Sequence, residues 1–153
     1  MPLIVHQEFV RAPIERCFDL ARDVDTHTRT TAYTKEKAVG GVTTGLLSVG
    51  DVVTWEAVHF GVRQRLTAKI TKMDRPYMFE DIMVKGAFHS FTHVHEFIEK
   101  ENGTLMIDRF CYRSPLGTIG RVADKLFLEW YMKKFIVNRA EALRQIAEEE
   151  LNN

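Results

Sequence analysis

"VVTWEAVHFGVRQRLTAKITKM" (residues 52–73) contains the first two of five β-like runs that follow one another along the chain. The series continues with YMFEDIMVK (77–85), SFTHVHEFIE (90–99) and TLMIDRFCYR (104–113). Short segments with turn chemistry separate the runs: FGV, DRP, KGAF and KENG. Strands that follow one another through such short turns form an antiparallel meander, so this stretch predicts a β-sheet.

The segments on either side of the meander complete the fold. Residues 3–11 read as a first strand, and residues 12–25 as a helix with Pro13 in its first turn. A second helix is expected at about 25–32, and a short strand broken by glycines at 36–45. Beyond residue 113, apolar residues recur at helical spacing from about 119 to 151, which predicts a helix about 45 Å long. Such a helix must cross a whole sheet, so we expect an α+β domain over residues 1–153 with a cavity between sheet and helix.

Composition excludes several classes of function. The 153 residues include 21 Lys+Arg and 21 Asp+Glu, a balance that argues against a nucleic-acid partner. No run of about 20 apolar residues exists to span a membrane, and no signal peptide is visible. Cys17 and Cys111 have no CxxC partner, which indicates reduced thiols in a cytoplasmic protein.

Four segments carry a resemblance to a known family. They are IERCFDLARDVD (14–25), VGDVVTWEAVHFGVRQRLTAKIT (49–71), YMFEDIMVKGAFHSFTHVHEF (77–97) and GTLMIDRFCYRSPLGTIGRVADKLF (103–127). In these the chain resembles the START/polyketide cyclase-dehydrase (SRPBCC, helix-grip) superfamily, and in particular a bacterial subgroup of ligand-binding proteins. The resemblance implies a helix-grip fold, in which a curved antiparallel sheet of about seven strands wraps around a long C-terminal helix. It leaves function open, because the superfamily includes lipid carriers, receptors and cyclases.

The turns predict the strand register. If KENG closes Glu99 against Thr104, the opposed pairs are Phe97–Met106, His95–Asp108, His93–Phe110 and Phe91–Tyr112. If Phe60 and Gly61 form the earlier turn, the pairs are Trp55–Leu66, Ala57–Gln64 and Glu56–Arg65. One face of this hairpin then carries Trp55, Ala57, His59, Val62, Gln64, Leu66, Ala68 and Ile70, and it must face inward because the other face is charged. Glu56 and Arg65 are expected to form an exposed cross-strand pair.

Alternation carried into the next strands predicts the interior. It places Phe79, Asp81 and Met83 inward, together with Phe91, His93, His95 and Phe97. The interior would then hold a polar cluster of Gln64, Asp81, His93, His95 and Asp108. A bulge at Gly86 would invert the last two strands, and their other face is also apolar, so the pattern alone leaves this point open.

These faces predict a binding site for a small, mostly apolar or amphipathic molecule. The expected ligand-binding residues are Trp55, His59, Gln64, Phe79, Asp81, Met83, Phe91, His93, His95, Phe97, Asp108 and Tyr112. Trp130 and Tyr131 lie on the helical stripe, where they either pack in the core or form a lid. No cofactor is expected, and a homodimer is possible.

Two other functions stay open. A cyclase or dehydratase would use His95, Asp81 or Asp108 as a general acid or base. A protein-interaction module would instead have its interior filled by side chains. A metal site formed by His93, His95, Asp81 and Asp108 is conceivable, but no HExxH or Cys/His spacing supports it, so no metal is expected.

Overall fold

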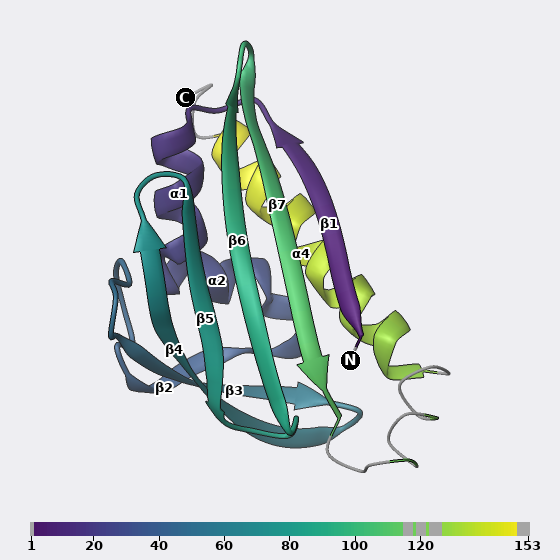
Figure 1. Ribbon diagram of the computed structural model, residues 1–153. Coiled ribbons are helices and arrows are strands. Elements are labelled where there is room, and N and C mark those ends of the chain that lie inside the picture. Colours follow the sequence, from purple (N-terminus) through teal and green to yellow (C-terminus); the bar gives the residue numbers. More distant parts are fainter. Residues whose placement is uncertain (1, 115–117, 119–121, 123–126, 150–153) are drawn as a thin grey trace.

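The computed structural model describes residues 2–114, 118, 122 and 127–149 (Figure 1). The chain begins with strand β1 (Leu3–Val10), helices α1 (Ile14–Arg22) and α2 (Val24–Thr30), and a short 3-10 helix (Ala32–Thr34). Six strands follow: β2 (Lys37–Gly41), β3 (Val52–His59), β4 (Val62–Asp74), β5 (Met78–Lys85), β6 (Ser90–Lys100) and β7 (Gly103–Arg113). Helix α4 (Glu129–Glu149) comes last. This order confirms the predicted arrangement of elements.

The seven strands form one antiparallel sheet in the order β1-β7-β6-β5-β4-β3-β2. Strands β2 to β7 are a meander, and β1 closes the far edge by pairing with β7. The sheet is curved, and α1, α2 and α4 lie behind it in Figure 1, against its concave face. The molecule therefore has the helix-grip architecture, in which the interior lies between the curved sheet and the helices.

Both predicted hairpin registers are confirmed. Phe97 pairs with Met106 and His95 with Asp108 across β6 and β7, and Trp55 pairs with Leu66 across β3 and β4. The β3–β4 turn has Phe60 and Gly61 at φ 55° and 74°, the left-handed pair that suits a two-residue hairpin. The register is local in origin, since the turn sets which residues face each other.

The strands on either side of Gly86 keep their faces. Asp81 lies opposite His93, and Phe79 lies opposite His95. Directly opposed residues share a face of the sheet, so these four side chains all point inward. The inversion that the sequence left open does not occur.

Two hydrophobic clusters hold the helices on the sheet. In the first, Phe18 of α1 contacts Phe79 and Phe97 edge-on, with ring centroids 5.5 and 5.4 Å apart. The second surrounds Phe110 and Tyr112, and Ile136 of α4 packs into it. Each fully buried aromatic ring stabilises the fold by about 1.5–3 kcal/mol. The clusters anchor the two ends of the interior.

The predicted stripe on the last helix is correct only toward its C-terminal end. Ile136, Ala140, Leu143 and Ala147 are buried at the spacing of a core-facing stripe. Trp130 is wrong as a core or lid residue, because its side chain is 58% exposed. At about 3.6 residues per turn it lies far around the helix from Ile136. The predicted start at residue 119 and end at 151 fall outside the described residues.

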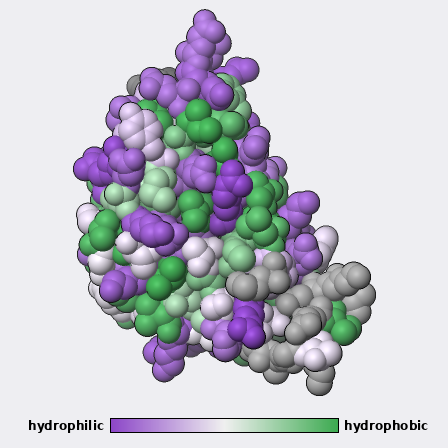
Figure 2. Space-filling model, viewed as in Figure 1, coloured by the Kyte–Doolittle hydropathy of each residue, from purple (hydrophilic) through white to green (hydrophobic). Residues whose placement is uncertain are grey.

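Two residues of the β3–β4 hairpin also differ from expectation. Val62 was expected inward but is 57% exposed, because it adjoins the turn at the end of the sheet. Glu56 pairs with Arg65 on the outer face as predicted, with Oε2 3.0 Å from the arginine Nε. Its side chain is nevertheless buried, because Lys37, Arg63 and Arg65 cover it. Figure 2 shows this outer face of the sheet, where hydrophilic and hydrophobic residues are interspersed.

Candidate ligand-binding site

A cavity of about 560 Å³ lies between the sheet and the first turns of α4. Its volume falls within the range of roughly 300–1,000 Å³ that is typical of small-molecule sites. Strands β3 to β7 supply one wall and α4 supplies the opposite one. The lining comprises His27, Glu36, Trp55, Ala57, His59, Phe60, Gln64, Arg65, Leu66, Ala68, Asp81, Ala87, Phe88, Phe91, His93, Phe110, Ser114, Leu128, Tyr131, Met132 and Phe135.

Most of the wall is apolar. Trp55, Phe91 and Phe110 project from the strands, where alternation directs them inward. Leu128, Tyr131, Met132 and Phe135 recur at helical spacing on α4 and just before it, so they form one face. This face adjoins the buried stripe that begins at Ile136. The two stripes let one helix both pack against the sheet and line a cavity.

A histidine–glutamate pair forms one polar part of the lining. His27 Nε2 lies 2.7 Å from Glu36 Oε1, and the His27 ring stacks on Trp55 with centroids 4.1 Å apart. Burial lowers the pKa of His27, and the charge of Glu36 offsets this only in part. Burial alone would raise the pKa of Glu36, but His27 and then Arg139 outweigh it and lower that pKa. At neutral pH the pair is therefore a neutral imidazole that donates to an ionised carboxylate.

A second polar contact lies nearer the β3–β4 turn. His59 Nδ1 and the Tyr131 hydroxyl are hydrogen-bonded at 2.5 Å, which joins β3 to α4 across the cavity. Burial lowers the pKa of His59 and raises that of Tyr131. Both groups are therefore neutral near pH 7, and their polar atoms are largely satisfied by each other.

A cluster of two carboxylates and two imidazoles forms the third polar part. His95 lies between Asp81 and Asp108, with Nε2 3.0 Å from Asp81 Oδ1 and Nδ1 3.1 Å from Asp108 Oδ1. The same Asp108 oxygen is 2.9 Å from His93 Nε2. The two imidazole rings lie against each other, tilted by 33°, with centroids 3.8 Å apart. Asp81 and His93 face the large cavity, while His95 and Asp108 lie behind them.

The hydrogen bonds in this cluster decide where the charges lie. Burial alone would lower the pKa of His95, but its bonds to Asp108 and Asp81 outweigh burial and raise it. Burial and the neighbouring charge of His95 lower the pKa of His93. For both acids the histidine hydrogen bonds outweigh burial, so the pKa of Asp81 is lowered and that of Asp108 lies well below its usual range. The contacts thus favour the charged forms of Asp81, Asp108 and His95 and the neutral form of His93.

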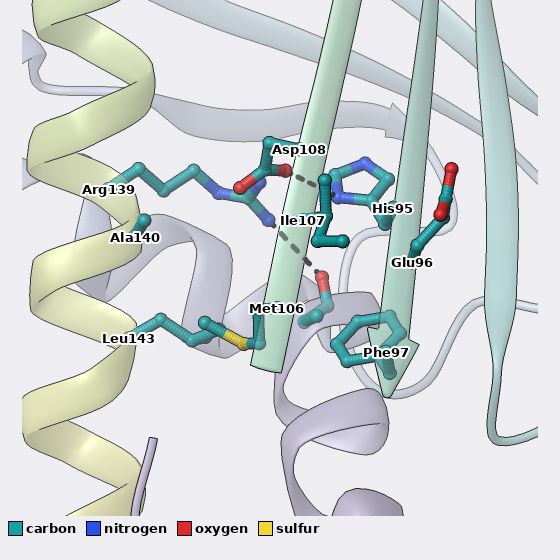
Figure 3. A pocket seen from close by; sticks show the side chains of 10 residues that line it. His95, Glu96, Phe97, Met106, Ile107, Asp108, Arg139, Ala140 and Leu143 are labelled. Atoms are coloured by element: carbon teal, nitrogen blue, oxygen red, sulfur yellow. Dashed lines mark hydrogen bonds and ion pairs between the residues drawn. The ribbon is translucent and has the colours of Figure 1, made fainter. Parts of the chain in front are cut away.

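Behind the cluster is a second, much smaller pocket (Figure 3). Its volume of about 20 Å³ is enough for roughly one water molecule. Arg139 reaches into it from α4, beside Asp108 (Figure 3). Its guanidinium donates from a terminal nitrogen to the carbonyl of Ala21 at 3.2 Å. The guanidinium is thus the nearby permanent positive charge, but it lies on the far side of the cluster from the large cavity.

The predicted ligand-binding residues divide into three groups. Six line the large cavity: Trp55, His59, Gln64, Asp81, Phe91 and His93. His95, Phe97 and Asp108 line the small pocket instead. The other three, Phe79, Met83 and Tyr112, line neither one.

Packing explains this last group. Phe79 stacks on His95 with centroids 4.2 Å apart, and Phe88 and Phe110 cover Tyr112. Met83 is partly buried against the cluster of Phe110 and Tyr112. They support the lining from behind.

Sequence reasoning missed several lining residues. Phe110 could have been predicted as a lining residue, since it is the predicted partner of His93 across β6 and β7. Met132 and Phe135 had a weaker signal, their helical spacing with Leu128. Tyr131, which was expected to pack in the core or form a lid, lines the cavity from α4. His27 and Glu36 had none, because they come from a short helix and a connecting segment that no pattern ties to the sheet.

The cluster also has the spacing of possible metal ligands. One ligand atom each from Asp81, His93 and His95 lie within 4.8 Å of one another, and this is the one such group in the described part of the chain. Carboxylate oxygen and imidazole nitrogen suit zinc or iron. Against this, each of these side chains already has a hydrogen-bond partner within the cluster. The absence of a metal therefore stays a prediction.

Comparison with known proteins gives the fold. No protein-family model matches the sequence, and no curated protein matches it. TTHA0849 from Thermus thermophilus superposes with a TM-score of 0.78 at 18% identity, covering 94% of this chain and 95% of that one. Ginseng major latex-like protein 151 from Panax ginseng gives a TM-score of 0.71 at 14% identity, with 95% and 97% covered. Ms6760 from Mycobacterium smegmatis gives 0.71 at 17%, with 94% and 89% covered.

These three structures match nearly the whole chain, so the chain has their fold, a curved antiparallel sheet wrapped around a long C-terminal helix. The low sequence identities limit the likeness to the fold. Among the described residues, no helix is long and apolar enough to cross a membrane.

Proposed function

We propose that the chain is one binding domain for a small, mostly apolar molecule with a polar end, held in the cavity between the sheet and α4. The observation that carries the proposal is the cavity of about 560 Å³ itself. Aromatic and aliphatic side chains form most of its wall, and a few convergent polar groups lie at defined places in it. That combination is characteristic of small-molecule sites.

A displacement experiment with a cavity-filling variant tests this proposal. Ala57 is buried on β3 and lines the cavity, so Ala57→Phe places a ring in the space that the ligand would occupy. We expect the affinity for the neutral probe N-phenyl-1-naphthylamine, measured by its fluorescence, to fall about tenfold or more. Val84→Phe on the exposed outer face of β5 is the matched control and should bind as the wild type does. Equal binding by both variants would contradict the proposal.

A second candidate is an enzyme of the cyclase or dehydratase kind. The arrangement of Asp81 and His93 favours it, because both face the cavity while His95 and Asp108 set their charge from behind. Such a pair can move protons on a bound molecule. Asp81→Asn should then abolish turnover of a bound polyketide-like chain without weakening its binding. Unchanged turnover in Asp81→Asn and in His95→Ala would exclude this candidate.

The third possibility, an interaction module with a filled interior, loses its premise because the cavity is present. The proposed site of action is the cytoplasm, which the two free cysteines, Cys17 and Cys111, support. A homodimer stays a prediction.

A further inference from the structure

Two carboxylates in the polar lining of the cavity have hydrogen-bond capacity to spare. Glu36 and Asp81 both line it, and each uses one carboxylate oxygen to accept from a histidine, His27 and His95 respectively. Within the described part of the chain, the second oxygen of each carboxylate receives no hydrogen bond from another side chain. A carboxylate accepts at both oxygens and donates at neither when ionised. Two acceptor oxygens are therefore left for a bound molecule.

Trp55, Gln64 and Ser114 are neutral donors on the same surface, but its cationic donors point away from the cavity. The hydrogen bond between His59 and Tyr131 occupies the polar atoms nearest the β3–β4 turn. Arg65 touches the cavity, but its guanidinium is on the outer face with Glu56. Arg139 lines the small pocket and donates to the Ala21 carbonyl. An anionic group in the cavity would find no free cation facing it among these residues.

Acidic groups are concentrated at the polar end. Three carboxylates, Glu36, Asp81 and Asp108, lie there, and each accepts from an imidazole. The one guanidinium beside them, Arg139, lines the small pocket and donates to the Ala21 carbonyl. Negative charge in a low-dielectric interior is costly unless a cation compensates it, and a cationic group on the ligand would do so from the side of the large cavity.

We infer that the ligand is an amphipathic amine, whose ammonium group donates hydrogen bonds to Glu36 and Asp81 while its apolar part lies against Trp55, Phe91 and the α4 face. This inference rests on the proposed function, since it names the chemical class of molecule that the same cavity binds. The apolar wall selects for a hydrophobic body, and the two free carboxylate oxygens select for a donor with positive charge. Charge complementarity thus distinguishes amines from alcohols and fatty acids of equal length.

Three probes with one chain length test the inference. Octylamine, 1-octanol and octanoate carry the same apolar chain and differ only in the polar group. We expect isothermal titration calorimetry at pH 7 to show octylamine binding about tenfold or more tightly than octanoate, with octanol between them. Octanoate binding as tightly as octylamine would overturn the inference and leave the proposed function intact. If none of the three probes binds and N-phenyl-1-naphthylamine does not bind either, the proposed function fails, and the inference with it.

Single-residue variants test whether the cavity carboxylates cause the preference for octylamine over octanoate. Glu36→Gln and Asp81→Asn each remove one negative charge while keeping the shape of the side chain, so each should reduce the ratio of octylamine to octanoate affinity several-fold. Glu80→Gln is the control, because Glu80 adjoins Asp81 on β5 but pairs with Thr71 and Lys72. An equal reduction in Glu80→Gln would overturn the assignment to the cavity carboxylates. The wild-type ratio decides the inference even if Asp81→Asn fails to fold.

Discussion

The Asp108 carboxylate accepts hydrogen bonds from two histidine rings, and one of its oxygens serves both His93 and His95. With His93 neutral, this side chain favours the tautomer that has its hydrogen on Nε2. It also contributes to the raised pKa of His95. The chemistry of the cavity face therefore depends on a residue that does not itself line the large cavity.

Replacing this residue should destabilise the fold in a pH-dependent way. In Asp108→Asn the buried, protonated His95 loses one of its two partners, so we expect the free energy of unfolding near pH 6 to fall by about 3–5 kcal/mol. The pKa of Asp108 is lowered by folding, so its stabilisation is present above the ordinary carboxyl pKa of about 3.9 and is lost as pH falls below that value. The difference between variant and wild type should shrink in acid.

Urea unfolding at several pH values measures this difference. The exposed Asp74→Asn is the control and should change the free energy of unfolding by no more than about 0.5 kcal/mol. A difference that stays constant from pH 6 to pH 3 would show that Asp108 acts by packing and not by its charge.

At the scale of the elements, β2 approaches β3 so closely at Gly41 that only a glycine fits. Gly41 has φ 67°, and a Cβ added there would lie 2.0 Å from the Val52 carbonyl oxygen. Gly45 has a similar φ of 82°, but a Cβ added there would meet nothing within 4 Å. The two positions share backbone strain and differ in space, so they form a matched pair.

We expect Gly45→Ala to lower the free energy of unfolding by about 1–2 kcal/mol, the cost of a left-handed φ at a residue with a Cβ. Gly41→Ala should cost clearly more, because β2 must also move away from β3. Urea denaturation followed by circular dichroism compares them. An equal decrease in the free energy of unfolding for both variants would mean that β2 can move away from β3 at Gly41 without further cost.

Helix α4 has a face buried in the core and a face exposed to solvent. Leu143 is buried on the core stripe, while Trp130 is exposed and contacts Phe127 and Lys134. Leu143→Ala should lower the free energy of unfolding by about 2–5 kcal/mol because it leaves a cavity in the core. Trp130→Ala should lower it by less than about 1 kcal/mol, since an exposed cation–π contact is weak. Losses of similar size in chemical denaturation would contradict this division of the helix.

On the scale of the whole molecule, residues of both hydrophobic clusters line the cavity, and packing leaves its volume unfilled. A ligand that binds only the folded state should therefore stabilise the protein strongly. Octylamine at 100 times its dissociation constant should add about 2.7 kcal/mol to the free energy of unfolding. Thermal unfolding with and without octylamine measures this, and Ala57→Phe should show a much smaller rise in Tm. An equal rise in the wild type and in that variant would place the binding outside the cavity.

The sheet and much of the lining that its strands carry were predictable from the amino-acid sequence. The registers of the β3–β4 and β6–β7 hairpins followed from their turns, and inward alternation brought Asp81, His93 and His95 together. These features were predictable because a turn and a two-residue period act between neighbours in the chain.

The rest of the site depends on how elements that are distant in the sequence pack together. This packing brought His27 and Glu36 to the cavity, assigned His95 and Asp108 to the small pocket, and turned Trp130 outward. It also buried Glu56 under three basic side chains on the outer face. Burial and charge pairing are set by which elements pack against each other in space. The periodicity of a single strand or helix does not specify which residues of a distant element will lie opposite it.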